Sequence, residues 1–141
     1  MKRPFLYVLI LATLLLVPLE RAEIAKLEPV QGVWLYKENG MVVLETDTED
    51  TGVGITVEEA LQNMKQNSAG IIYLDTAQYL FVTNAEDQIP AMKQYLKESV
   101  RVCSWTGETE ISEAVQYADA HKIGMKLQNW NASVKLPKLP I

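Results

Sequence analysis

The sequence predicts a single small α+β domain in which a mixed β-sheet is packed by two to three helices. Several short segments are rich in β-branched and aromatic residues, which favours strands. Between them lie segments whose apolar residues recur at helical spacing. The chain has 141 residues, enough to bury a core without a disulfide or a structural metal.

The first strand pair is predicted from "VQGVWLYKENGMVVLETD". Residues 30–37 and 41–47 are strand-like, and Asn39-Gly40 lies between them. Asn-Gly between two apolar segments is a strong indication of a tight hairpin turn. An acidic loop with two glycines, residues 48–55, is expected next.

A helix is predicted over 57–68. Thr56 and Glu59 have the spacing of a capping box, in which each side chain satisfies a backbone amide at the helix start. The apolar residues then fall on one stripe that faces a core: Val57, Ala60, Leu61 and Met64.

The second half predicts further strands and helices. "IIYL" and "YLFV" are strand-like runs separated by a short polar stretch, and we expect them to pair as a second hairpin. Helices are expected at 86–98 and 110–122, with a strand in "VRVCSW" between them and a last strand in "MKLQNW". The predicted order is β-β-α-β-β-α-β-α. Residues 30–130 form the globular domain in this interpretation, and 131–141 an extended, proline-spaced tail.

The N-terminus is typical of an export segment. Lys2 and Arg3 precede an uncharged apolar run at 5–19. As a helix, this run would span about 22 Å, shorter than the ~30 Å hydrocarbon core and typical of a cleaved signal peptide. The run nevertheless lacks a small-x-small cleavage site, so we favour an uncleaved anchor within residues 1–22, followed by a linker at 23–29. Its membrane-facing residues would include Phe5, Leu6, Leu9, Leu14 and Leu19.

The N-terminal segment also predicts the orientation of the chain, and the composition predicts the kind of partner. The two cations before the apolar run predict that the rest of the chain lies on the outer face of a bacterial membrane, or outside the cell if the segment is cleaved. The chain carries 13 Lys and Arg against 18 Asp and Glu, a net charge of −5. No cationic cluster is present in the sequence, which argues against nucleic-acid binding. The expected partners are envelope or membrane proteins.

Residues with catalytic potential are few. The sequence has one His, His121, and one Cys, Cys103, and it lacks the motifs of serine hydrolases, P-loop proteins and zinc proteases. We interpret Cys103 as a buried strand residue and His121 as a helix C-terminal residue. No catalytic residue and no cofactor is therefore expected, and the chain is not predicted to be an enzyme.

One loop resembles a calcium-binding sequence. Asp47, Gly52 and Glu58 match positions of an EF-hand loop, and Glu49 lies between them. Glu49 is longer than the residue that an EF-hand uses there, and the segment before the loop is strand-like instead of helical. Weak, unspecific calcium attraction by Asp47, Glu49 and Glu58 is the remaining hypothesis for this loop.

Aromatic residues lie mostly on the predicted strands. Burial against a helix layer is the ordinary explanation, whereas aromatic residues exposed on a sheet edge or face would mark a docking surface. The sequence leaves this choice open for Trp34, Tyr36, Tyr73, Tyr79, Phe81, Trp105 and Trp130.

The order of these segments resembles the N-terminal domain of the spore germination lipoproteins, the C subunits of germinant receptors in endospore-forming bacteria. The resemblance rests on "ERAEIAKL", on "IIYLDTAQYLFVT", and on a helix start that matches G-x-T-x-x-E-A-L at Gly54, Thr56, Glu59, Ala60 and Leu61. Pro18 occupies the place of the family's lipidated Cys, so a retained anchor would replace the lipid. The chain also stops after one domain, where the family continues.

The resemblance implies a non-enzymatic, membrane-anchored interaction domain of a spore-forming bacterium, acting in spore germination or in assembly of the sporulation envelope. A sheet edge or the tail would make the contact. The alternative is a secreted module that binds a small ligand or calcium.

Overall fold

The computed structural model describes residues 27–68 and 71–141. In this part the chain forms a single small α+β domain with a mixed sheet and three helices. The strands are β1 (Leu27–Pro29), β2 (Gly32–Glu38), β3 (Met41–Thr46), β4 (Thr51–Gly54), β5 (Ile71–Tyr73), β6 (Tyr79–Thr83), β7 (Arg101–Ser104) and β8 (Met125–Lys126). The helices are α2 (Val57–Asn67), α3 (Ile89–Met92) and α4 (Ile111–His121), with short 3₁₀ turns at Leu74–Thr76, Glu86–Gln88 and Leu127–Asn129.

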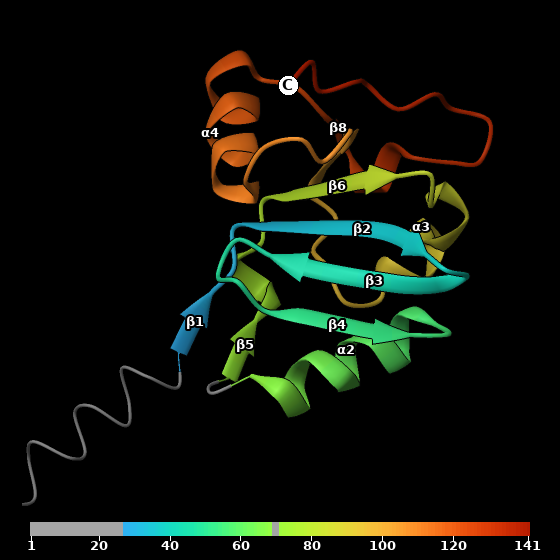
Figure 1. The fold of residues 1–141 in the computed structure, drawn as a ribbon. Coiled ribbons are helices and arrows are strands. Elements are labelled where there is room, and N and C mark those ends of the chain that lie inside the picture. Colours follow the sequence, from blue (N-terminus) through green and yellow to red (C-terminus); the bar gives the residue numbers. More distant parts are fainter. Residues whose placement is uncertain (1–26, 69–70) are drawn as a thin grey trace, which may run out of the picture.

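Six strands form the main sheet in the order β4-β3-β2-β6-β7-β8. The pairs β2–β6 and β6–β7 are parallel and the other pairs are antiparallel, so the predicted mixed sheet is confirmed. Figure 1 shows β6, β2, β3 and β4 side by side, with α2 beside β4 and α4 at the opposite end of the row.

The predicted first hairpin is present. β2 and β3 pair antiparallel with Tyr36 opposite Val43, and Asn39 and Gly40 form the turn with φ of 52° and 78°. Positive φ at both central residues is the conformation that the Asn-Gly dipeptide favours in tight hairpins. This turn sets which residues of the two strands share a face.

The segment expected as an acidic loop contains an additional strand, β4, which pairs antiparallel with β3. Its sequence, Thr-Gly-Val-Gly, has few strand-forming residues, and tertiary contact explains its conformation. A Cβ at Gly52 would lie 2.0 Å from the Ala60 carbonyl oxygen, and one at Gly54 would lie 2.5 Å from the Ala60 nitrogen. The two glycines therefore let α2 lie directly against β4.

The expected second hairpin is wrong. β5 pairs in parallel with β1 as a separate two-stranded sheet, and β1 lies within the segment expected as a linker. β6 instead lies between β2 and β7, parallel to both. The physical reason is burial: the side chains from Tyr79 to Val82 are all buried, which suits a central parallel strand covered on both faces.

Two of the three predicted helices are confirmed. α2 begins after Thr56, whose hydroxyl accepts a hydrogen bond from the Glu59 amide at 3.2 Å. α4 matches the helix expected at 110–122. The helix expected at 86–98 is wrong in length, because only α3 is α-helical there. Ile89, Met92 and Leu96 are buried nonetheless, since turns after α3 also bring an apolar side chain to the core.

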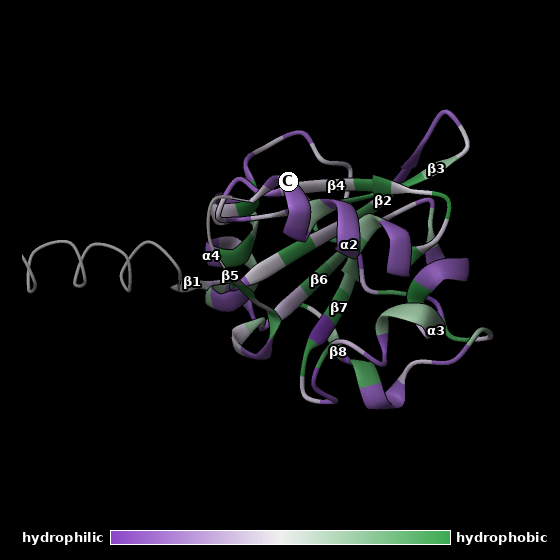
Figure 2. Cartoon of the chain, turned by 90° about the horizontal axis from the view of Figure 1, so that it is seen from below, coloured by the Kyte–Doolittle hydropathy of each residue, from purple (hydrophilic) through white to green (hydrophobic). Residues whose placement is uncertain are grey.

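The sheet separates two cores. On one side α2 and α3 cover Val33, Leu35, Leu44, Leu80 and Val102. On the other side Ala114, Val115 and Ala118 of α4 cover the aromatic residues of β6 and Trp105, which directly follows β7. Figure 2 shows the central strands largely hydrophobic and α2 largely hydrophilic, as expected for a helix with one face on the sheet.

The C-terminal tail is part of the packed domain. Leu136 and Leu139 are 8% and 1% exposed. Ser104 donates to the Pro137 carbonyl and accepts from the Leu139 amide, both at 2.8 Å, so the tail runs beside the end of β7. The proline spacing keeps the tail extended, and the two leucines hold it in place.

The contact of α2 with β4 gives a first prediction. Gly52→Ala is expected to lower the free energy of unfolding by about 2 kcal/mol or more, because the added methyl group meets helix backbone that cannot move aside. Urea unfolding followed by circular dichroism measures the change. The neighbouring exposed Val53→Ala is the control and is expected to change stability by less than about 1 kcal/mol. Equal stability of Gly52→Ala and the wild type would contradict the close packing.

Candidate docking surface

Within the described part of the chain, neither α4 nor the tail covers one part of the sheet on the α4 side. By the strand register, Tyr36 of β2, Val43 of β3 and Val53 of β4 lie side by side on this face. α4 and the tail cover β6 and β7 instead. We define the open face by the α4-side residues that neither α4 nor the tail covers: Tyr36, Glu38, Met41, Val43, Glu45, Thr51 and Val53.

Exposed hydrophobic residues gather at this place. Among the described residues, the large hydrophobic side chains that are exposed are Met41, Val53 and Ile55, at 36%, 39% and 72%. Continuing the β3–β4 register by one residue places Ile55 opposite Met41. Because contiguous apolar patches mark interaction surfaces, these three residues make this place the candidate docking surface of the domain.

A row of aromatic rings leads from the core to the open face. The ring centroids of Phe81 and Trp105 are 5.4 Å apart, those of Trp105 and Trp34 5.1 Å, and those of Trp34 and Tyr36 4.0 Å. Phe81 and Trp105 are buried, whereas Trp34 and Tyr36 are half-buried. The sequence left open whether the aromatic strand residues are buried or exposed, and both occur: the inner two rings belong to the core, and the outer two reach the surface. Tyr79 and Trp130 are also buried.

Hydrogen bonds hold the two outer rings. The Trp34 indole donates to Thr83 Oγ1 at 2.9 Å, and the Tyr36 hydroxyl donates to Glu45 Oε2 at 2.7 Å. Burial, the hydrogen bond to Glu45 and the charges of Glu45 and Glu38 together raise the pKa of Tyr36 well above its usual value. Tyr36 therefore stays neutral at physiological pH and keeps donating to the carboxylate.

An acidic groove of about 300 Å³ adjoins the open face, between the β3–β4 turn and the start of α4. Trp34 forms part of its wall, and the Oγ1 atom of Thr109 in its lining is buried without a hydrogen-bond partner in the described part of the chain. No Lys or Arg lines the groove; its acidic residues are Glu45, Asp47, Glu49 and Glu110. The surface around the open face is thus negatively charged.

A sheet edge is one of the two expected contact sites, and the edge at β4 is occupied by side chains of α2. The outward-facing amide of Val53 donates to Asn63 Oδ1, and the amide of Ile55 donates to Glu59 Oε2, both at 3.0 Å. A strand of another protein would have to displace both side chains before it could pair with β4. The second expected site, the tail, contributes two buried leucines to the domain. The exposed apolar surface is accordingly on the face of the sheet.

The three acids of the candidate calcium loop do not form one site: Asp47 and Glu49 line the acidic groove, whereas Glu58 is not part of its lining. Asp47 Oδ1 accepts hydrogen bonds from the amides of Gln31 and Gly32, at 2.9 and 3.2 Å. Glu49 lies in the turn with a φ of 67°, and Glu58 lies in the first turn of α2. Within residues 27–68 and 71–141, no group of three His, Cys, Asp or Glu side chains is arranged to hold a metal ion.

The surroundings of His121 and Cys103 agree with structural roles. His121 is the last residue of α4, and its ring lies 4.1 Å from that of Tyr117. Cys103 is fully buried, and burial raises the pKa of its thiol to about 12. A thiol with this pKa carries almost no thiolate at neutral pH and is a poor nucleophile.

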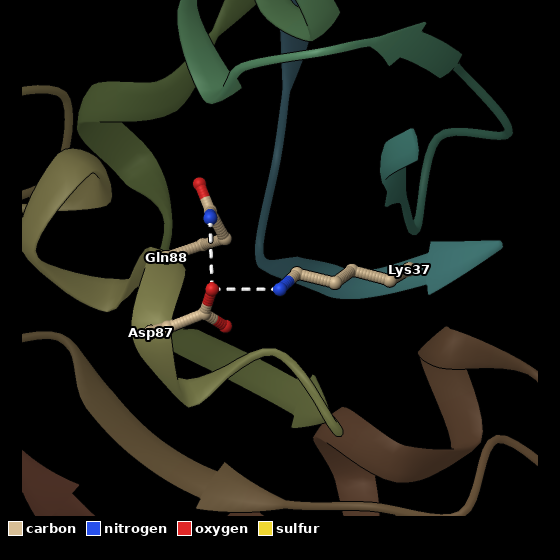
Figure 3. A network of polar contacts seen from close by, with 3 residues as sticks. All are labelled: Lys37, Asp87 and Gln88. Atoms are coloured by element: carbon tan, nitrogen blue, oxygen red, sulfur yellow. Dashed lines mark hydrogen bonds and ion pairs between the residues drawn. The ribbon is translucent and has the colours of Figure 1, made fainter. Parts of the chain in front are cut away.

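A cation near the open face belongs to the other side of the sheet. Lys37 follows Tyr36 in β2 and so points the opposite way, where its Nζ lies 2.6 Å from Asp87 Oδ2. Figure 3 shows Asp87 between Lys37 and Gln88, whose amide also donates to it. The hydrogen bond from Lys37 lowers the pKa of Asp87, but the pair is exposed and contributes less than about 1 kcal/mol to stability.

The proposed anchor residues Phe5, Leu6, Leu9, Leu14 and Leu19 lie outside the described residues. None of the helices in the described part of the chain has the length and hydrophobicity that crossing a membrane requires. Comparison with protein-family models, with curated proteins and with solved structures gave no match to this chain.

The Tyr36–Glu45 contact gives a second prediction. Glu45→Gln is expected to lower the pKa of Tyr36, because the substitution removes a negative charge beside the hydroxyl. Titration of ¹³C-labelled tyrosine followed by NMR, with Tyr36→Phe to assign the resonance, measures the change. Glu113→Gln on the exposed side of α4 is the matched control and is expected to leave the pKa unchanged. An unaltered Tyr36 titration in Glu45→Gln would contradict the contact.

Proposed function

We propose that this chain is a non-enzymatic, membrane-anchored extracytoplasmic protein-interaction domain of a spore-forming bacterium, acting in spore germination or sporulation envelope assembly. The observation that carries the proposal is the position of Met41, Val53 and Ile55, which are exposed together beside a sheet face that none of the described helices covers. Burying such residues against a partner removes apolar surface from water, the main driving force of protein association.

The proposed mechanism is docking without chemistry. The apolar run at 5–19 would hold the domain at the membrane, which confines it to two dimensions and raises its effective concentration near membrane partners. The open face would then make the contact. The half-buried rings of Trp34 and Tyr36 are held by neighbouring groups, so little conformational freedom would be lost on binding.

The setting in germination rests on the resemblance to the germination lipoproteins. Gly54, Thr56 and Glu59 of the resembling motif have definite roles here: Gly54 admits α2, the Thr56 hydroxyl caps it, and the Glu59 carboxylate accepts from the amide of Ile55 just before the cap. These roles give a structural reason for the residue types at the three motif positions. Pro18 in place of the lipidated Cys makes the N-terminal anchor essential to the proposal.

The alternative is a secreted module that binds a small cationic ligand or calcium. The acidic groove favours it, because the groove combines an indole wall with carboxylates, and the hydroxyl of Thr109 in its lining has no hydrogen-bond partner among the described residues. In this alternative the N-terminal segment is cleaved and the domain acts away from the membrane.

The anchor gives the third prediction, which separates the two functions. We expect mass spectrometry of the protein from native membrane and soluble fractions to find an intact species, Met1 to Ile141, in the membrane. Leu9→Arg combined with Leu14→Arg is expected to release it, because charges are costly in a hydrocarbon core. The control is Gln62→Arg with Gln66→Arg, which adds the same charge at exposed positions of α2. Buried positions such as Leu61 and Leu96 are unsuitable, because an Arg there would disrupt the core.

A soluble species that begins near residues 22–26 would overturn the anchored function and favour the secreted module. Calcium and small-cation binding would then be measured by calorimetry.

A further inference from the structure

We propose that the open face binds a basic, partly apolar segment of the partner protein, with a Lys or Arg side chain against Tyr36 and within reach of Glu38 and Glu45. This inference rests on the proposed docking function and specifies the chemistry of the partner. It follows from the charges, the aromatic ring and the apolar residues that share this face.

The charges of the open face have one sign. Glu38 and Glu45 flank Tyr36 along the α4 side of β2 and β3, and none of the seven residues that define the face is Lys or Arg. The nearby Lys37 is directed to the opposite side and is paired with Asp87. The adjoining groove adds Asp47, Glu49 and Glu110. A cationic partner would meet attraction over the whole region, strongest at low salt.

The ring of Tyr36 provides a platform for a cation. It packs against the Trp34 ring at an interplanar angle of 30° and is fixed through its hydroxyl to Glu45, while remaining half-exposed. A Lys or Arg group over such a ring gains a cation–π interaction and can pair with the neighbouring carboxylate at the same time. A small cation without an apolar neighbour would use only part of this surface.

The apolar part of the face selects between classes of partner. Met41 and Val53 are exposed next to the charged residues, with the buried Val43 between Tyr36 and Val53 in the register. An anionic lipid surface would be repelled by Glu38 and Glu45. A second copy of this chain would present the same two carboxylates. A segment of another protein that carries both cationic and apolar side chains could pair with the carboxylates and cover the apolar residues at the same time.

The fourth prediction concerns binding of a defined probe. The full chain, held in detergent micelles, is titrated with a short fluorescent peptide built of Lys, Ser and Leu, and with a counterpart in which Glu replaces Lys. We expect the Lys peptide to bind and the Glu peptide not to bind. Glu38→Gln with Glu45→Gln is expected to weaken the Lys peptide roughly fivefold, from the loss of two partly exposed charge pairs.

Matched controls separate local recognition from overall charge. Glu58→Gln with Glu98→Gln removes the same charge at exposed positions elsewhere and is expected to leave binding nearly unchanged. Tyr36→Leu keeps an apolar side chain and is expected to weaken the Lys peptide about threefold through loss of the cation–π interaction. Equal weakening by both pairs of Glu substitutions would overturn the inference, since binding would then depend on net charge.

The proposed function and this inference can fail separately. Met41→Ser with Val53→Asn removes the apolar residues without changing charge. If both peptides bind and only this apolar variant lowers their affinity, the open face is a docking surface whose partner is not basic. That result would overturn the inference. If peptide binding is unaffected by every substitution on the open face, the docking surface itself is wrong.

Discussion

The close contact between α2 and the glycines of β4 is the constraint on which the rest of the structure depends. Gly52 and Gly54 carry no side chain, so the helix backbone at Ala60 lies where a Cβ would be. This position lets Asn63 accept a hydrogen bond from the outward amide of Val53 in β4, and lets Glu59 accept one from the amide of Ile55, just after the strand. The same helix thus completes one core and closes the β4 edge of the sheet.

The two faces of β2, β3 and β4 then have different roles. Residues such as Leu35 and Leu44 point to α2 and form the core. Their neighbours Tyr36 and Glu45 point the other way, where α4 does not reach. Because side chains alternate along a strand, the hairpin turn at Asn39-Gly40 fixes both sets at once. A shift of one residue in this register would exchange core and surface residues. The interactions that stabilise the core therefore also determine which side chains lie on the open face.

Local patterns in the sequence predict a large part of this fold. The Asn-Gly turn, the capping residues Thr56 and Glu59, and the apolar stripes of α2 and α4 are all local, and each is present in the structure. The pairing of β5 with β1 and the central place of β6 depend on contacts between distant segments, which local patterns do not encode. β4 was missed because glycines disfavour strands unless a neighbouring helix requires them.

The candidate site was predictable only in part. Trp34 and Tyr36 stood out as aromatic strand residues, but their half-exposure follows from where α4 ends, which the sequence does not specify. Asp47 looked like a calcium ligand, yet its carboxylate bonds the backbone at Gln31 and Gly32. The alternation Tyr36-Lys37-Glu38 was a usable indication, since it places the cation and the acid on opposite faces of a strand.

Site-specific photocrosslinking in native membranes tests most directly whether the open face docks a partner protein. A photoreactive amino acid is placed at Val53 on the open face or at Lys65, an exposed position on α2. The account predicts a discrete crosslinked protein from position 53, none from position 65, and loss of the position 53 product when Met41 is replaced by Ser. Equal products from both positions, or a product from position 65 alone, would contradict it.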